Sequence, residues 1–196
     1  EVTEGHPLTI SGCGEGGSIE RTHHESHPNG CAVRVRGDFT LYGGSLKTHG
    51  RNGYGIFVTA PGGGFHVAIA GGSVSSGGNA VQVGSASDVT LRGGQVYGKK
   101  SGVVLANDGI SFTMTGGSVT GENERGITTN NYDITLSISD GTIHGGDAGI
   151  RLLTTSDGGT TISGGTITSE NGVGIDQMDL SLNGWGEEVQ EATLIL

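Results

Sequence analysis

The sequence has few large apolar side chains and no long apolar run. Aromatic residues make up 5 % of the 196 residues, which excludes a wide core packed around large rings. No segment approaches the roughly 18 consecutive apolar residues of a membrane-spanning helix, so we expect no membrane insertion. No signal peptide pattern is present either. We therefore expect a soluble segment trimmed from a longer precursor.

Basic residues are also scarce. Ten Lys and Arg stand against twenty Asp and Glu, for a formal net charge of -10. Nucleic acids and anionic membranes attract clustered positive charge. We therefore expect neither as a partner, whereas a host protein or a glycan remains open.

Proline is rare and glycine is abundant. The chain has three prolines and 41 glycines without a Gly-X-Y period, which excludes collagen. The glycines recur instead in pairs, each followed by Ser, Thr or Gln and then by an apolar residue. These pairs begin at Gly16, Gly43, Gly71, Gly93, Gly116 and Gly164, and Asp140-Gly141 and Gly184-Trp185 occupy the same position. The even spacing indicates a repeat of roughly 24 residues.

Short apolar segments with a period of two surround each pair. Before it stands a triplet such as Val89-Thr90-Leu91, whose outer residues are expected to point inward. One apolar residue follows the pair, and a third apolar unit follows a loop of variable length. The same residue types recur in the same chain direction, which favours parallel stacking of like on like. We predict an all-β fold, a single-stranded right-handed parallel β-helix (β-solenoid) of about eight coils with three short strands each.

The whole chain, residues 1–196, is expected to form one solenoid domain and to be monomeric. Residues 1–37 depart from the repeat and are predicted to form an irregular N-terminal coil or cap. Residues 38–184 hold the regular coils. Residues 185–196 are predicted to form a C-terminal cap or the start of a following domain.

The two cysteines, Cys13 and Cys31, flank the insertion in the first coil. We predict a disulfide between them, which would close a loop of about 18 residues and contribute on the order of 3 kcal/mol. Such a bond is typical of proteins outside the reducing cytosol. It therefore favours an extracellular location.

Three segments carry a resemblance to a known group of proteins: Ile162-Ser-Gly-Gly-Thr-Ile167, Met114-Thr-Gly-Gly-Ser-Val119 and Ala148-Gly-Ile-Arg-Leu152. With them the chain resembles the right-handed β-helix segments of bacterial surface and secreted proteins, including autotransporter-like passengers and adhesin-like proteins of gut bacteria. The resemblance covers about residues 8 to 184. It implies this fold and an extracellular address, secreted or at the cell surface.

Candidate ligand-binding residues lie outside the inward columns. Four aromatic residues are placed to stack against sugar rings, and the loops after the second strand add charges of both signs. The candidates are Tyr42, Tyr54, Phe57, Tyr97, Arg51, Lys99, Lys100, Glu122 and Glu124. We expect a non-enzymatic extracellular or cell-surface module that binds a host protein or glycan, or acts as a rigid stalk.

The alternative is a polysaccharide lyase or glycoside hydrolase. Its candidate carboxylates are Glu122, Asp147 and Glu170, in the loops of three consecutive coils. Glu122 and Glu170 share one column, with backbones about 10 Å apart, near the upper limit for an inverting glycosidase. Neighbouring acids also suit Ca²⁺. The constellations typical of pectin hydrolases are missing, so we expect no catalytic residue and no cofactor.

Two further patterns have an ordinary explanation. His23, His24 and His27 crowd the first insertion, but their spacing is one residue short of the helical His-Glu-x-x-His zinc motif, and no helix is expected there. We therefore expect a polar loop rather than a metal site. An outward column of threonines resembles ice-binding solenoids, yet Ala68 interrupts it and threonine simply suits exposed strand positions.

Overall fold

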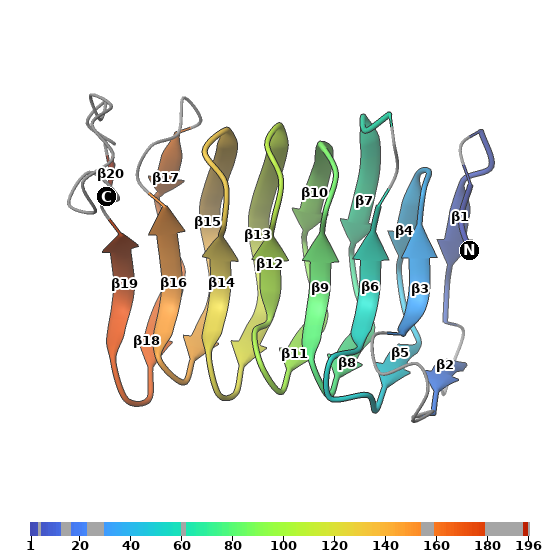
Figure 1. Ribbon diagram of the computed structural model, residues 1–196, viewed down its shortest axis with the longest axis horizontal. Helices are drawn as coiled ribbons and strands as arrows, with labels where there is room; N and C mark the ends of the chain where they lie inside the picture. The colour runs from blue at the N-terminus through green and yellow to red at the C-terminus, as the bar shows by residue number, and fades with distance from the viewer. Residues whose placement is uncertain are drawn as a thin grey trace.

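The computed structural model is a rod of stacked parallel strands (Figure 1). It describes residues 1–3, 5–12, 17–22, 30–59, 62–153, 159–178 and 194–195. Every regular element in these ranges is a β-strand. No helix in the described part of the chain is long and apolar enough to cross a bilayer.

Each coil contributes strands to three sides of the rod. The first side holds β1 (Leu8–Ile10), β4 (Phe39–Leu41), β7 (Phe65–Ile69), β10 (Ser87–Leu91), β17 (Thr160–Ile162) and β20 (Leu194–Ile195). The second holds β2 (Ser18–Arg21), β5 (Ser45–Thr48), β8 (Ser73–Ser76), β11 (Gln95–Gly98) and β18 (Thr166–Ser169). Two long strands, β13 (Ile110–Gly121) and β15 (Ile134–Gly145), run through both sides and join them into one 13-stranded sheet.

The third side is a separate sheet of seven strands. It consists of β3 (Cys31–Val35), β6 (Tyr54–Val58), β9 (Asn79–Val83), β12 (Val103–Leu105), β14 (Arg125–Thr129), β16 (Ala148–Leu153) and β19 (Val173–Met178). All its pairings are parallel. Each strand therefore pairs with the equivalent strand of the next coil, as the repeat predicted.

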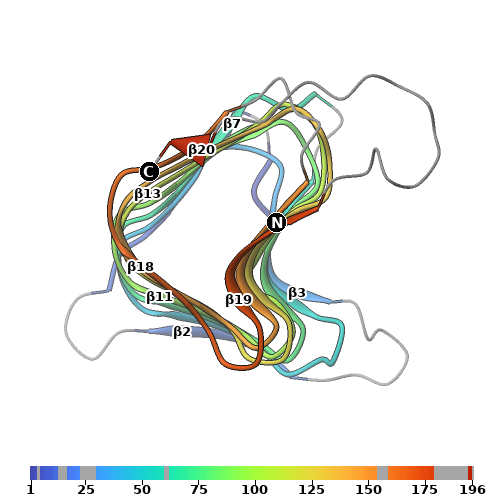
Figure 2. The same ribbon diagram turned by 90° about the vertical axis from the view of Figure 1, so that its left-hand side faces the viewer.

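The parallel β-solenoid is confirmed, but it has about six turns rather than the eight expected. The expected count included a last unit at residues 180–184, which lies outside the described residues together with Trp185. The rod is right-handed. Figure 2 looks along it from the C-terminal end. In each coil the chain runs counter-clockwise towards the viewer, from the first side through the second side, where β11 and β18 are labelled, to the third side, where β3 and β19 are labelled.

The core is a set of ladders of like side chains inside the rod. Val89 lies between Val67 and Phe112 in neighbouring coils, and Leu91 lies between Ile69 and Met114. All six side chains are buried. The prediction that the outer residues of the triplets point inward is confirmed from β4 to β15, whereas Leu8 in the first coil is 39 % exposed and the triplet at residues 180–182 lies outside the described residues.

The glycine pairs form the corner between the first and second sides. In the five later pairs the second glycine has a positive φ, as at Gly94 and Gly117, where φ is 82°, whereas Gly17 in the first coil does not. L side chains rarely adopt this conformation. The sharp turn at these five corners thus depends on glycine, as the sequence predicted.

Candidate functional site

The third side of the rod bends inward, so that its outer face is concave (Figure 2). One outward residue of each strand in the seven-stranded sheet pairs with its equivalent in the next coil. From N- to C-terminal coils this row is Arg34, Phe57, Gln82, Val104, Thr128, Arg151 and Asp176. Strand spacing puts successive members about 4.8 Å apart. We call this outer face the concave side.

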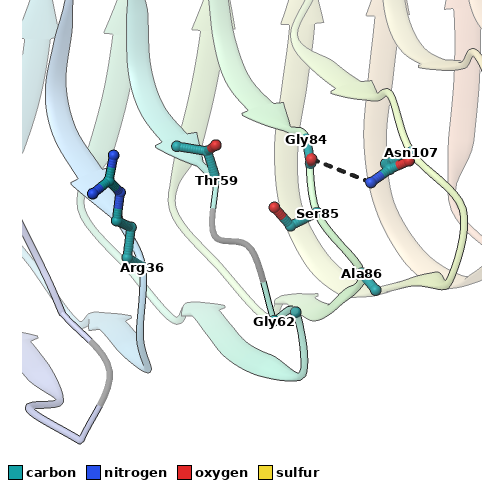
Figure 3. Close-up of a pocket in the computed structure, with 8 residues that line it drawn as sticks. Arg36, Thr59, Gly62, Gly84, Ser85, Ala86 and Asn107 are labelled. Carbon is teal, nitrogen blue, oxygen red and sulfur yellow. Dashed lines mark hydrogen bonds between the residues drawn. The ribbon is translucent and has the colours of Figure 1, made fainter.

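A first hollow, the Arg36 hollow, lies where the chain leaves β3, β6, β9 and β12 and has a volume of about 540 Å³. Figure 3 shows it. Its walls are Arg36, Thr59, Gly62, Gly63, Gly84, Ser85, Ala86 and Asn107. Asn107 Nδ2 donates a hydrogen bond to the Gly84 carbonyl (3.3 Å), and Arg36 pairs with Glu1 (2.9 Å). Small side chains and exposed backbone leave room here for a ligand.

A second hollow, the Arg125 hollow, has a volume of about 370 Å³. It is lined by Asn79, Ser101, Val104, Glu124, Arg125, Thr128, Thr129, Asn130, Arg151, Leu153 and Met178. Its lining residues belong to or adjoin β9, β12, β14, β16 and β19, whereas those of the Arg36 hollow follow β3, β6, β9 and β12. The Arg125 hollow therefore lies on the concave side, and it extends further towards the C-terminal coils than the Arg36 hollow does.

Charged side chains of alternating sign meet in the Arg125 hollow. Arg125 lies 3.7 Å from Glu124 through Nη1 and 3.7 Å from Asp147 through Nη2. Ser101 donates a hydrogen bond to Glu124 (3.0 Å). The Nε of Arg125 is buried and has no hydrogen-bond partner among the described residues. The guanidinium is thus held between two carboxylates while one of its donors stays unpaired.

One coil further on, Arg151 Nε donates a hydrogen bond to Asp176 Oδ2 (2.6 Å). Both side chains are only partly exposed. A short charge-assisted hydrogen bond of this kind orients both groups. Arg151 therefore forms a fixed part of the wall of the hollow.

Aromatic and amide side chains lie nearer the N-terminal end of the concave side. The rings of Tyr54 and Phe57 stack with their centroids 5.0 Å apart, and the guanidinium of Arg34 lies 5.9 Å from the centre of the Phe57 ring. Asn79 donates a hydrogen bond to Gln82 (3.1 Å). This end thus combines a flat apolar surface with planar hydrogen-bonding groups.

The structure separates the aromatic residues that the sequence singled out. Tyr54 and Phe57 lie together on the concave side. Tyr97 lies on β11 in the 13-stranded sheet, between Ser75 and Thr120 of the adjacent coils. Tyr42 directly follows β4 and is 61 % exposed. Only two of the four aromatic residues therefore belong to the concave side.

Two of the three predicted loop acids, Glu122 and Glu170, occupy equivalent positions in their coils. The amides of Glu122 and Glu170 donate to Gly98 and Gly145, two coils apart, and Gly146 takes the position between them. Both glutamates are exposed, and neither lines the two hollows. Of the three predicted catalytic carboxylates, only Asp147 reaches the Arg125 cluster.

The basic loop residues also lie apart from the hollows. Lys100 Nζ donates a hydrogen bond to Asn52 Oδ1 (2.7 Å), in the loop that also holds Arg51. The carbonyl of Lys99 accepts a hydrogen bond from Asn123 (2.6 Å). Among the predicted charged residues, Glu124 is the one that lines a hollow.

Sequence reasoning missed Arg125, Arg151 and Asp176. A usable signal is present, because the third apolar unit of each coil has one outward residue between two inward ones, as in Ile150-Arg151-Leu152. Aligning these middle positions gives the central row of the concave side. The row varies in residue type, so the repeat itself does not draw attention to it.

The disulfide stays a prediction. Cys31 is half-buried at the start of β3, and Cys13 lies outside the described residues. Alkylation of the native protein without reductant, followed by mass spectrometry, should detect no free thiol. Two labelled cysteines in freshly folded protein would contradict both the bond and the argument for an oxidising compartment.

Metal-ligating residues do not gather in the described part of the chain. No group of three or more His, Cys, Asp or Glu side chains there is placed to hold a metal ion. His23, His24 and His27 lie outside the described residues. The prediction for this loop therefore stays open.

Comparison with known proteins identifies the family. Residues 22–184, most of the chain, match the family described as "NosD: Periplasmic copper-binding protein (NosD)". No curated protein and no solved structure matches the chain. The resemblance to β-helix proteins of the bacterial envelope is supported, whereas the autotransporter-like and adhesin-like features stay predictions. On the strength of this match, the chain belongs to the NosD family.

Proposed function

We propose that this chain is a non-enzymatic binding module, extracellular or at the cell surface, that holds a glycan along its concave side. The observation that carries the proposal is the stacked pair Tyr54–Phe57, next to hydrogen-bonding amides on the same sheet. Sugar rings have apolar faces and polar edges. The aromatic surface can stack against the apolar face of a sugar ring, and the neighbouring amides can form hydrogen bonds with the hydroxyl groups at its edge.

The shape of the concave side supports an extended ligand. The central row has seven positions, which at the strand spacing of about 4.8 Å cover roughly 29 Å of the rod. The Arg125 hollow lies on this side and extends further towards the C-terminal coils than the Arg36 hollow does. A linear glycan lying parallel to the rod axis would therefore contact several coils at once.

The family description names copper, but the described residues do not fit a copper site. Copper prefers Cys, Met and His ligands. Met114 is fully buried in the core, whereas Met178 lies at the end of β19 and is 38 % exposed. No group of three or more His, Cys, Asp or Glu side chains in the described part is placed to hold a metal ion. We therefore propose no copper function for the described coils.

A catalytic role for the predicted acids has little support. A glycosidase needs two carboxylates facing the same bound sugar. Glu122 and Glu170 share a column, but neither lines the Arg36 hollow or the Arg125 hollow. We accordingly favour binding without turnover.

Removal of the aromatic surface tests the proposal. Phe57→Ala or Tyr54→Ala should weaken binding to the best-bound glycan of an array about tenfold, because stacking and apolar contact are lost (about 1.4 kcal/mol). Tyr97→Ala is the matched control, since this exposed ring lies on the other sheet. It should leave binding unchanged.

Three results of the same binding and activity measurements would contradict the proposal. Unchanged affinity in Phe57→Ala and Tyr54→Ala would place the ligand elsewhere, and binding only to host proteins would overturn the glycan proposal. Cleavage of a polysaccharide that Glu122→Gln or Glu170→Gln abolishes would establish the enzyme alternative.

A further inference from the structure

Resting on the proposed function, we infer that the Arg125 hollow selects neutral glycans over acidic ones and that Arg125 contacts the bound sugar. The hollow and its immediate partners hold two guanidinium groups and three carboxylates. Arg125 lies between Glu124 and Asp147, and Arg151 is bonded to Asp176. Both arginines thus have acidic partners, and the cluster carries excess negative charge.

This balance opposes an anionic ligand. Recognition of a carboxylate or sulfate depends on positive charge that the protein has not already neutralised. Here a uronic acid reaching Arg125 would meet the carboxylates of Glu124 and Asp147 at the same place. The whole chain, with its formal charge of -10, adds to this repulsion. Acidic sugars are therefore disfavoured.

The same groups suit the hydroxyl groups of a neutral sugar. A hydroxyl both donates and accepts hydrogen bonds, so it can bridge a guanidinium and a carboxylate. The Nη1 and Nη2 atoms of Arg125 lie 3.7 Å from their nearest carboxylates, beyond the usual length of a hydrogen bond, and therefore have donor capacity for an uncharged acceptor. Arg125 makes no contact shorter than 3.7 Å to its two acidic partners, so a sugar oxygen has little to displace.

The hollow also has neutral polar groups around the cluster. Asn79, Ser101, Thr128 and Asn130 contribute amides and hydroxyls to its walls. Ser101 already orients Glu124 through a hydrogen bond of 3.0 Å. Since Glu124 accepts this bond at one oxygen, its other oxygen has capacity for a sugar hydroxyl.

The test compares hexasaccharides of equal length by isothermal titration calorimetry at physiological ionic strength. The probes are the neutral hexamers of glucose, mannose, xylose and galactose, together with hexagalacturonate. We expect at least one neutral hexamer to bind and hexagalacturonate to bind at least tenfold more weakly than it. Arg125→Lys, which keeps the charge but removes the fork of donors, should weaken the neutral ligand about tenfold. Arg92→Lys, on the exposed side after β10, is the matched control and should have no effect.

A second variant tests the charge argument without touching Arg125. The double variant Glu124→Gln/Asp147→Asn should bind hexagalacturonate more tightly than the unmodified protein does. The ratio between the affinities for the neutral hexamer and for hexagalacturonate should therefore fall. Tighter binding of hexagalacturonate than of every neutral hexamer in the unmodified protein would overturn this inference while leaving the glycan proposal intact. So would equal effects of Arg125→Lys and Arg92→Lys. Absence of binding to all five probes would overturn this inference, and absence of binding to the array as well would overturn both.

Discussion

Replacement of Leu91 by aspartate is expected to unfold the coils around it. Leu91 is 1 % exposed and lies in the inward ladder between Ile69 and Met114. A carboxylate there is buried without a partner, which costs several kcal/mol. Since domains are stable by only about 5–15 kcal/mol, a loss of at least about 4 kcal/mol takes away a large share of the free energy of unfolding and greatly lowers the melting temperature.

The neighbouring residue provides the matched control. Thr90 belongs to the same strand but faces outward, where it pairs with Ala68 and Thr113. Thr90→Asp should therefore change the free energy of unfolding by no more than about 1 kcal/mol. Thermal unfolding followed by circular dichroism compares the two variants. Equal melting temperatures would show that the assigned strand register is wrong.

The inward columns were predictable because they repeat. Every coil places the same class of residue at the same offset from its glycine pair, so Val89 predicts Val67 and Phe112 without any knowledge of the backbone path. Parallel order follows from this repetition, since only parallel strands stack equivalent positions on one another. The sequence repeat therefore predicts both the core residues and the parallel strand order.

The concave side was not predictable in the same way. Its shape depends on how sharply the chain turns between the second and third strands, and apolar periodicity carries no information about that angle. At Gly121 and Gly145, an added side chain would collide with the carbonyl of Arg125 or Ala148 beyond the turn. A glycine in the sequence indicates a close approach, but not the direction in which the sheet then bends.

The charged cluster was missed for a related reason. Arg125 and Asp147 lie 22 positions apart in the chain and meet only because adjacent coils stack. Neither belongs to an inward column, and the sequence alone drew attention to the exposed loop acids instead. Site residues on a solenoid are assembled across coils, whereas the repeat describes what is common to all of them.

Replacement of Gly94 by alanine is expected to cost about 3 kcal/mol in the free energy of unfolding. Gly94 has a φ of 82°, and a Cβ built there would lie 2.7 Å from the carbonyl oxygen of Gly72 in the preceding coil. The left-handed conformation costs a non-glycine residue roughly 1–2 kcal/mol. The contact with rigid backbone adds about 1–3 kcal/mol, because two paired coils must separate locally.

Two other glycines separate these contributions. Gly64 also has a positive φ, of 78°, but a Cβ there would meet nothing within 4 Å, so Gly64→Ala should cost only about 1–2 kcal/mol. Gly84 lacks the positive φ and its added Cβ would lie 3.4 Å from the Val58 carbonyl, an ordinary contact. Gly84→Ala should be neutral or slightly stabilising, since alanine loses less backbone entropy on folding. Chemical denaturation of the three variants should rank them in this order. A Gly94→Ala variant as stable as Gly84→Ala would mean that the glycine corner neither needs a left-handed residue nor packs against the coil beneath it.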